Sequence, residues 1–208
     1  FVGLAFDLAF KYRNPAIILA DGVIGQMMEK VVLPEQRPRL TNEEVMARCP
    51  WATFGKLKHR GPNIVTSLEL DPAEMEKRNI HLQQKYAEIE EKEVRYEEIH
   101  CDDAEYLIVA FGSCARIAQK AMEEARAEGI KVGLLRPITL WPFPSKAIAE
   151  RSRQVKGILT VELNAGQMVE DVRLAVECKV PVEYFGRLGG IVPDPDEVVT
   201  ALKEKIIK

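Results

Sequence analysis

The sequence predicts an α/β protein whose carboxyl-terminal half is a three-layer domain with a mainly parallel sheet. The apolar run 106–111 does not alternate with polar residues, which is typical of a strand covered on both faces by helices. Gly112 and Ser113 lead directly into an amphipathic stretch that ends near Gly129, where a left-handed helix cap belongs. This strand–helix unit recurs along the rest of the chain.

Further strands and helices complete the predicted domain. Short strands are expected at 131–136, 157–163 and 182–185, and helical patterns at 114–128, 144–153 and 167–177. The last helix has the clearest start, because Asp194 is an acid at the N-cap, Pro195 takes the first helical position and Glu197 completes a capping box. Residues 104–208 are therefore predicted to form one domain with its own core.

The first part of the chain does not contain enough strands for a domain. An apolar helical stretch ends near Tyr12, and a single strand is expected at 16–20, leading into Asp21 and Gly22. One strand cannot make a sheet. Residues 1–35 are therefore interpreted as the carboxyl-terminal remnant of a domain, a partial α/β segment of a longer polypeptide.

Residues 36–103 are predicted to form an irregular arm and a linker helix. The stretch 33–70 contains four prolines and scattered charges, and it is long for a structureless connection. We expect it to wrap over another domain or subunit. A second capping signature at 71–74 begins a charged helix that continues to about Glu93. Its apolar residues form a narrow seam, which favours a linker helix over a coiled coil.

Composition and cysteine spacing exclude several classes of protein. The chain has 208 residues, 47% of them hydrophobic, and a net charge of −3, so it lacks the basic surface of a nucleic-acid-binding protein. No apolar run is long enough to span a bilayer. The four cysteines are far apart and form no CxxC pair, so their spacing predicts no zinc or iron-sulfur site. Free thiols favour a reducing cytoplasm.

The usual catalytic motifs are absent from the sequence, which contains no GxGxxG, GxxxxGK[ST], GxSxG or HExxH. Two isolated residues remain as candidates. Cys114 lies at a helix N-terminus that would stabilise a thiolate, although a small residue packed in a strand–helix turn is the commoner explanation. Glu162 ends a strand and is either a general base or a structural hydrogen-bond partner of a helix terminus.

Several segments together resemble one family. Residues 5–15 and 17–29 resemble the end of the pyrimidine-binding domain in the alpha subunit of 2-oxoacid:ferredoxin oxidoreductases. The segments 109–116, 135–144 and 161–168 resemble, in the same order, the transketolase C-terminal-like domain of that family. The branch that acts on the branched-chain 2-oxoacid ketoisovalerate is the most similar.

The resemblance implies an enzyme that decarboxylates a 2-oxoacid with thiamine diphosphate, transfers the acyl group to coenzyme A and passes electrons through iron-sulfur clusters to ferredoxin. It places the thiamine, Mg²⁺ and cluster sites in other domains or subunits. The fragment is therefore expected to be inactive alone and to bind none of these cofactors. Its expected partners are the other subunits of a cytoplasmic complex and a second copy of itself, with ferredoxin and coenzyme A reached through the whole complex.

Two alternatives remain open at this point. One is the carboxyl-terminal half of a lipoamide-linked 2-oxoacid dehydrogenase or of a transketolase. The other is a non-catalytic domain that serves only to assemble a complex.

Candidate binding residues follow from the rule that ligands of open α/β sheets gather at the carboxyl ends of strands. After the first strand these are Asp21, Gly22, Gly25 and Gln26, which by resemblance approach a thiamine-binding subunit. In the second domain they are Ser113, Arg136, Asn164, Gly166 and Gln167. Purely structural roles are the commoner explanation for these residue types: a helix N-cap for the serine, turn positions for the asparagine and glycine, and cover for a helix end by the arginine.

Overall fold

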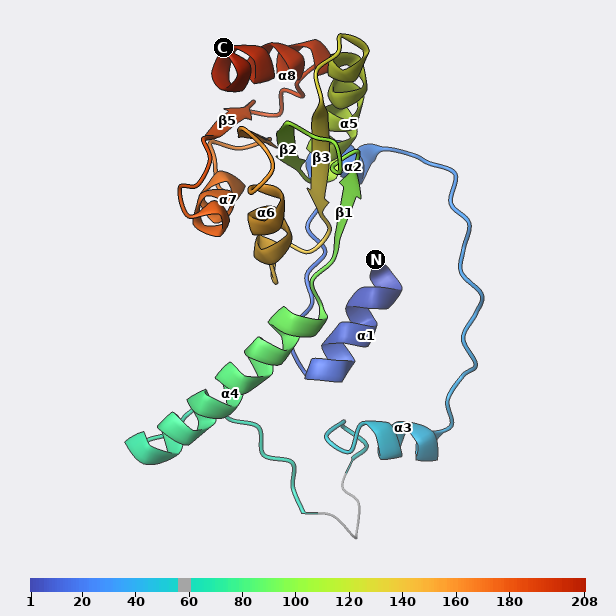
Figure 1. Ribbon diagram of the computed structural model, residues 1–208. Helices are drawn as coiled ribbons and strands as arrows, with labels where there is room; N and C mark the ends of the chain where they lie inside the picture. Colours follow the sequence, from blue (N-terminus) through green and yellow to red (C-terminus); the bar gives the residue numbers. More distant parts are fainter. Residues whose placement is uncertain (56–60) are drawn as a thin grey trace. The chain divides into compact units, whose positions relative to one another are not determined.

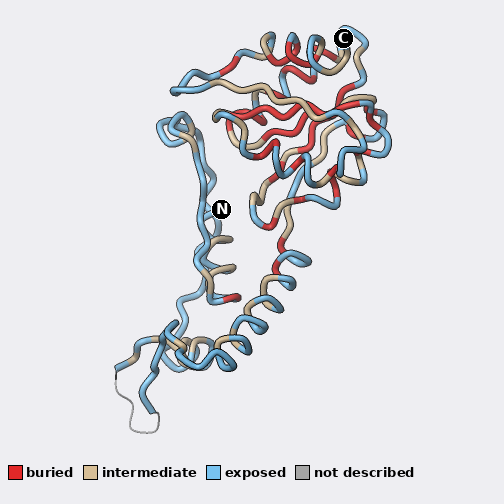
Figure 2. The backbone as a smooth tube through the Cα atoms, turned by 90° about the vertical axis from the view of Figure 1, so that its left-hand side faces the viewer, coloured by how far each residue is buried: buried red, intermediate tan, exposed pale blue. Residues whose placement is uncertain are grey.

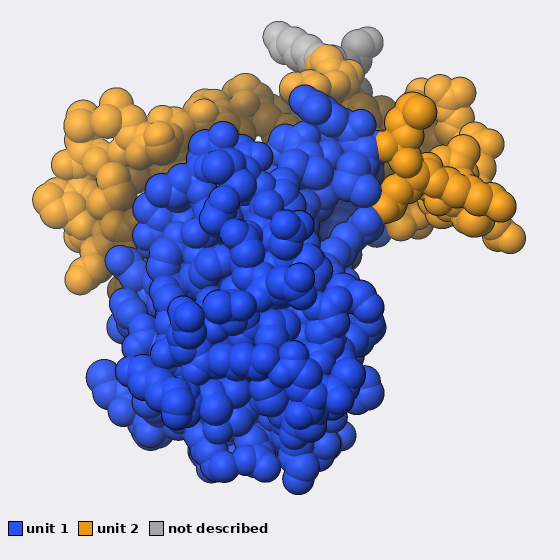
Figure 3. Space-filling model, turned by 90° about the horizontal axis from the view of Figure 1, so that it is seen from above, with its two compact units in different colours: residues 1–27, 83–208 blue, residues 28–82 orange. Residues whose placement is uncertain are grey.

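The computed structural model describes residues 1–55 and 61–208. These form two compact units, one made of residues 1–27 and 83–208 and the other of residues 28–82 (Figure 3). The first unit contains the sheet and is therefore the one that positions the candidate site.

The sheet has five strands in the order β1-β3-β2-β4-β5 (Figure 1). The strands are β1 (Tyr96–Ile99), β2 (Tyr106–Ala110), β3 (Val132–Pro137), β4 (Ile158–Glu162) and β5 (Val182–Gly186). All neighbouring pairs are parallel except β1 and β3, which are antiparallel. The predicted mainly parallel α/β fold is thus confirmed.

Helices cover both faces of the sheet. They are α5 (Gly112–Ala127), α6 (Ser145–Arg151), α7 (Met168–Val176) and α8 (Pro195–Leu202), and a single π-helical turn (Lys203–Ile207) follows α8. Ile108 of β2 packs in a core cluster with α5 and α8, whereas Leu107 packs in a second cluster with α6 and α7. Neighbouring residues of one strand therefore enter opposite layers, which explains the unbroken apolar run. Figure 2 shows this buried core in red.

Two predicted helix ends in this domain depend on local signals and are confirmed. The predicted start of α5 is wrong, because the helix begins at Gly112 after the N-cap Phe111, so Ser113 lies in its first turn and is not its N-cap. Gly129 follows α5 with a φ of +89° and donates its backbone N–H to the carbonyl of Arg126 at 2.9 Å. At the start of α8, Asp194 and Glu197 form the predicted capping box around Pro195.

The sheet begins before the predicted domain boundary at residue 104. The sequence of β1, Tyr-Glu-Glu-Ile, is too short and polar to predict a strand by itself. At an edge it needs no second apolar face, so its sequence lacks the pattern of a central strand. Glu98 and Leu135 are register partners across the antiparallel pair.

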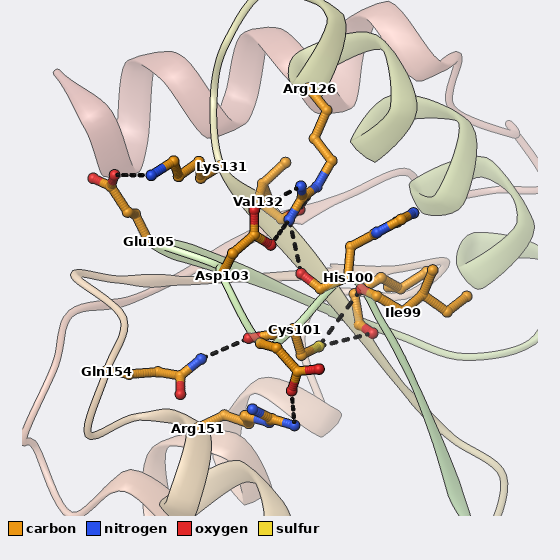
Figure 4. A network of polar contacts seen from close by, with 12 residues as sticks. Ile99, His100, Cys101, Asp103, Glu105, Arg126, Lys131, Val132, Arg151 and Gln154 are labelled. Atoms are coloured by element: carbon orange, nitrogen blue, oxygen red, sulfur yellow. Dashed lines mark hydrogen bonds and ion pairs between the residues drawn. The ribbon is translucent and has the colours of Figure 1, made fainter.

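The connection between β1 and β2 is held by polar contacts from α5 and from the turn that follows α6 (Figure 4). Arg126 of α5 donates to the carbonyl oxygens of Val132 at 2.7 Å and His100 at 2.8 Å, and it pairs with Asp103 at 2.5 Å. Gln154 donates to the Cys101 carbonyl at 2.6 Å. The edge strand and its connection therefore belong to the domain.

The prediction of a strand at 16–20 is wrong. The segment follows α1 (Val2–Tyr12) and precedes the short helix α2 (Gly22–Gln26), and its residues have no strand assignment. A strand requires a hydrogen-bonded neighbour. Among the described residues none pairs with it, and Ile17 and Leu19 are 84% and 69% exposed.

Within the described residues of the arm predicted to be irregular lies a helix, α3 (Asn42–Arg48). Thr41 and Glu44 form a capping box there, with the Glu44 backbone N–H donating to Thr41 Oγ1 at 3.2 Å. The Thr-x-x-Glu signal was present in the sequence. The helix predicted there is confirmed as α4 (Pro72–Lys92), which begins after Asp71 as expected and in which Ile89 is buried.

Candidate functional site

The topological switch point of the sheet lies between β2 and β4. Strand β2 has β3 on one side and β4 on the other, and the crossover through α5 covers one face while the crossover through α6 covers the opposite face. The carboxyl ends of two such strands form the crevice where α/β proteins of this type bind ligands. Helix α5 begins directly after β2, and the loop to α7 follows β4.

Glu162 ends β4 and is only 1% exposed. Its carboxylate accepts hydrogen bonds from the backbone N–H groups of Gln167 at 3.2 Å, Met168 at 2.8 Å and Val169 at 3.0 Å. These are orphan donors at the start of α7, so the carboxylate satisfies them and interacts favourably with the helix dipole. Of the two roles considered for Glu162, the structural one is observed.

Asp21 and Ser113 come together at the start of α5, although 92 positions separate them in the numbering of the sequence. Asp21 is the N-cap of α2 and accepts from the backbone N–H groups of Val23 and Ile24, each at 2.9 Å. Burial alone would raise the pKa of the Asp21 carboxyl. The hydrogen bonds from Ile24, from the side chain and backbone of Ser113 and from Val23 outweigh burial and lower that pKa.

Cys114 lies in the first turn of α5 and is 3% exposed. Burial, with smaller contributions from the negative charges of Asp21 and Glu162, raises the pKa of its thiol to about 12. The thiol is therefore protonated at neutral pH. A buried, protonated thiol matches the explanation of Cys114 as a small packing residue and does not favour a role as nucleophile.

The loop after β4 is shaped by its own hydrogen bonds. Asn164 Oδ1 accepts from the Gly166 backbone N–H at 2.7 Å, and Gly166 has a φ of +100°. The hydroxyl of Tyr184 on β5 donates to the Asn164 carbonyl. Burial, Glu162 and Cys114 raise the pKa of that hydroxyl. Tyr184 was not among the predicted residues, because nothing in a strand sequence tells which neighbouring loop its side chain will contact.

The remaining predicted residues either lie away from Asp21, Ser113 and Glu162 or make no contact that requires their residue type. Arg136 on β3 pairs with Glu97 of β1 at 2.8 Å, on the side of β2 that is opposite β4. Gly22 and Gly25 have open space where a Cβ would stand, so no close approach requires glycine there. Gln26 is exposed in the last turn of α2, and the side chain of Gln167 is exposed as well.

No group of three or more His, Cys, Asp or Glu side chains in residues 1–55 and 61–208 is arranged to hold a metal ion. No helix in that part of the chain is both long and apolar enough to cross a membrane. All four cysteines are free.

The fold and the residues around the switch point define a class of protein. It is an α/β domain in which the carboxylates near the switch point, Asp21 and Glu162, accept hydrogen bonds from helix N-termini of the same chain. Residues 104–198 match the family model of the pyruvate:ferredoxin oxidoreductase core domain II. The chain is 47% identical over 200 residues to the ketoisovalerate oxidoreductase subunit VorB of Methanothermobacter thermautotrophicus, an alignment that covers 96% of this chain and 55% of that protein.

More distant relatives are subunits of 2-oxoglutarate synthases. The 2-oxoglutarate synthase subunit KorA of Archaeoglobus fulgidus is 31% identical over 193 residues, covering 91% of this chain and 53% of that protein. Among solved structures, the 2-oxoglutarate:ferredoxin oxidoreductase of Magnetococcus marinus, with 2-oxoglutarate, coenzyme A and succinyl-CoA bound, has a TM-score of 0.58. It is 25% identical and covers 65% of this chain and 24% of its own. The chain spans about half the length of the curated relatives it matches.

Proposed function

We propose that the chain is part of the alpha subunit of a thiamine-diphosphate-dependent 2-oxoacid:ferredoxin oxidoreductase. The observation that carries the proposal is the 47% identity to a ketoisovalerate oxidoreductase subunit along 96% of the chain. Because identity to 2-oxoglutarate synthase subunits is lower, at 31%, a branched-chain 2-oxoacid is the favoured substrate class.

The reaction proposed for the whole enzyme is an oxidative decarboxylation. The 2-oxoacid loses its carboxylate as carbon dioxide, and its acyl carbon forms a thioester bond with the sulfur of coenzyme A, whose thiol proton is released. The two electrons left behind reduce ferredoxin. The bound coenzyme A and succinyl-CoA of the solved 2-oxoglutarate relative are consistent with the same acyl acceptor.

The helix N-termini beside Asp21 and Glu162 do not fit thiamine diphosphate. A diphosphate would accept hydrogen bonds at helix N-termini. At α5 the donors of Ser113 already bind the Asp21 carboxylate, and at α7 three backbone N–H groups bind Glu162. A further anion would be repelled by both carboxylates. We therefore assign the thiamine, Mg²⁺ and iron-sulfur sites to other domains or subunits and regard this chain as catalytically incomplete.

The role left to the chain is assembly in a cytoplasmic complex. Apolar side chains are exposed along its first part, among them Phe1 at 69% and Phe6 at 63%, and Trp141 is 55% exposed beside a proline. Exposed apolar surface of this extent is typical of a contact with a partner. We propose other subunits and a second copy of this chain as partners, with the arm at 33–70 contributing to the contact between copies.

The test is reconstitution of the complex. The complete subunit that contains this chain is produced with its companion subunits, and reduction of ferredoxin is followed with ketoisovalerate, 2-oxoglutarate or pyruvate in the presence of coenzyme A. We expect the highest kcat/KM with ketoisovalerate and no reduction without coenzyme A. Faster turnover of 2-oxoglutarate would contradict the substrate class. Electron transfer to lipoamide in place of ferredoxin would contradict the family.

A further inference from the structure

A buried carboxylate joins two distant parts of the first unit. Glu93 follows the last turn of α4 and is 5% exposed. It accepts from Lys11 Nζ at 2.6 Å and from the Tyr12 hydroxyl at 2.7 Å, both at the end of α1, and from Arg95 at 3.0 Å. All three donors approach one carboxylate that is removed from water, and two of them carry a positive charge. Hydrogen bonds of this kind are among the strong ones in proteins.

Lys85 of α4, eight residues before Glu93, makes a second contact with the same end of α1. Lys85 Nζ donates to Asn14 Oδ1 at 2.5 Å and to the Tyr12 carbonyl at 3.3 Å. That carbonyl is one of the groups left without a partner at a helix carboxyl end. A cation there also interacts favourably with the helix dipole. Glu93 and Lys85 thus bind opposite chemical features of the same four residues, 11–14.

These contacts are concentrated at the end of α1. Tyr12 is the buried residue of that helix, while Phe1 and Phe6 near its beginning are exposed. The backbone leaves the helix through Arg13, which has a φ of +50°. A second attachment of the same segment is Asp21, which accepts hydrogen bonds from Ser113.

Residues 28–82, which connect this segment to the rest of the first unit in sequence, form a compact unit of their own. Noncovalent contacts therefore hold the segment 1–27 in one compact unit with residues 83–208. Met28, the first residue of the connection, is 98% exposed. Nothing in the contacts of residues 11–14 with α4 requires the covalent link.

We propose that Lys85 and Glu93 form a docking surface that recognises a helix ending in a cation, a phenol and an amide, here Lys11, Tyr12 and Asn14, and that it binds this segment without a covalent connection. The carboxylate selects the cation and the phenol, and the ammonium selects the carbonyl end of the helix. Residues 1–27 are in this sense a ligand of the α/β unit.

The test uses the full chain with a specific protease site inserted after Met28. After cleavage, the fragment that ends at Met28 is expected to coelute with the remainder on size exclusion and to appear as a complex in native mass spectrometry. Complete release of the fragment at micromolar concentration would overturn the proposal.

Variants decide whether the named residues are responsible. Glu93→Gln keeps the size of the side chain and removes its charge, and we expect fragment binding to weaken roughly tenfold or more. Glu91→Gln, an exposed neighbour on α4, is the matched control and should change binding less than about twofold. Equal weakening in both variants would overturn the assignment to Glu93.

A variant of the fragment itself tests the contact without changing the larger part of the chain, so misfolding of that part cannot explain its effect. Tyr12→Phe removes one hydroxyl, and it should weaken binding in the presence of Glu93 but add little to the effect of Glu93→Gln, because the two groups share one hydrogen bond. Strict additivity of the two effects would contradict the proposed pairing.

Discussion

The carboxylate of Glu162 accepts a 2.8 Å hydrogen bond from the backbone N–H of Met168, the first residue of α7. A strand end and a helix start are thereby joined inside the core, since both residues are almost completely buried. Glu162, which the sequence suggested as a possible general base, thus caps the N-terminus of α7.

Replacement of Glu162 by alanine should leave three N–H groups without their partner. We expect the free energy of unfolding to fall by about 2–4 kcal/mol, because a buried charged hydrogen-bond acceptor is lost together with a helix cap. Urea titration followed by circular dichroism measures the change. Glu170→Ala on the exposed face of α7 is the control, and an equal loss in both variants would count against the capping role.

Glu93 predicts a pH dependence with a definite sign. Hydrogen bonds from Lys11, Tyr12 and Arg95 outweigh burial and lower its pKa from 4.5 to about 2. A depressed pKa in the folded state means that the stabilisation is complete above the unfolded pKa and disappears as the pH falls through the folded one. The difference in unfolding free energy between the native chain and Glu93→Gln should therefore be constant above pH 4.5 and shrink as the pH falls from 4.5 toward 2.

The measurement is a series of thermal or urea transitions of both chains across that range of pH. Because both chains share every other carboxyl group, the difference between them isolates Glu93. A difference that grows toward acid pH would reverse the sign and reject the contact.

Cys114 should be unreactive in the folded chain. Its thiol is buried and its pKa is raised to about 12, so very little thiolate exists at pH 8. We expect iodoacetamide to modify the exposed Cys178 much faster, as followed by mass spectrometry of peptides. The two should react at similar rates in urea, and rapid modification of Cys114 in the folded chain would show that the packing described here is absent.

The position of β1 predicts where the α/β domain can be cut. A fragment of residues 94–208 retains the edge strand, whereas one of residues 104–208 exposes β3 and loses the carbonyl of His100 that Arg126 binds. We expect a cooperative thermal transition for the longer fragment and a lower midpoint or a broad transition for the shorter. Identical transitions would mean that β1 contributes nothing to the stability of the domain.

The sequence by itself determined the elements whose signals lie within a few residues of one another. The capping boxes at Asp194 and Thr41 depend on residues three positions apart, and the cap at Gly129 depends on one glycine. The apolar run of β2 likewise reports its own burial on both faces. These elements are therefore readable without knowledge of the fold, and they include the helix after Thr41, in an arm predicted to be irregular.

The tertiary structure alone decided the features that depend on a distant partner. The segment 16–20 has the composition of a strand but no neighbouring strand to pair with, whereas the polar residues of β1 form a strand because β3 offers an open edge. The meeting of Asp21 with Ser113 and of Glu93 with Tyr12 is likewise invisible in the sequence. Hydrogen bonds and strand pairing act over a few ångströms in space, and only the folded chain brings these groups within that distance.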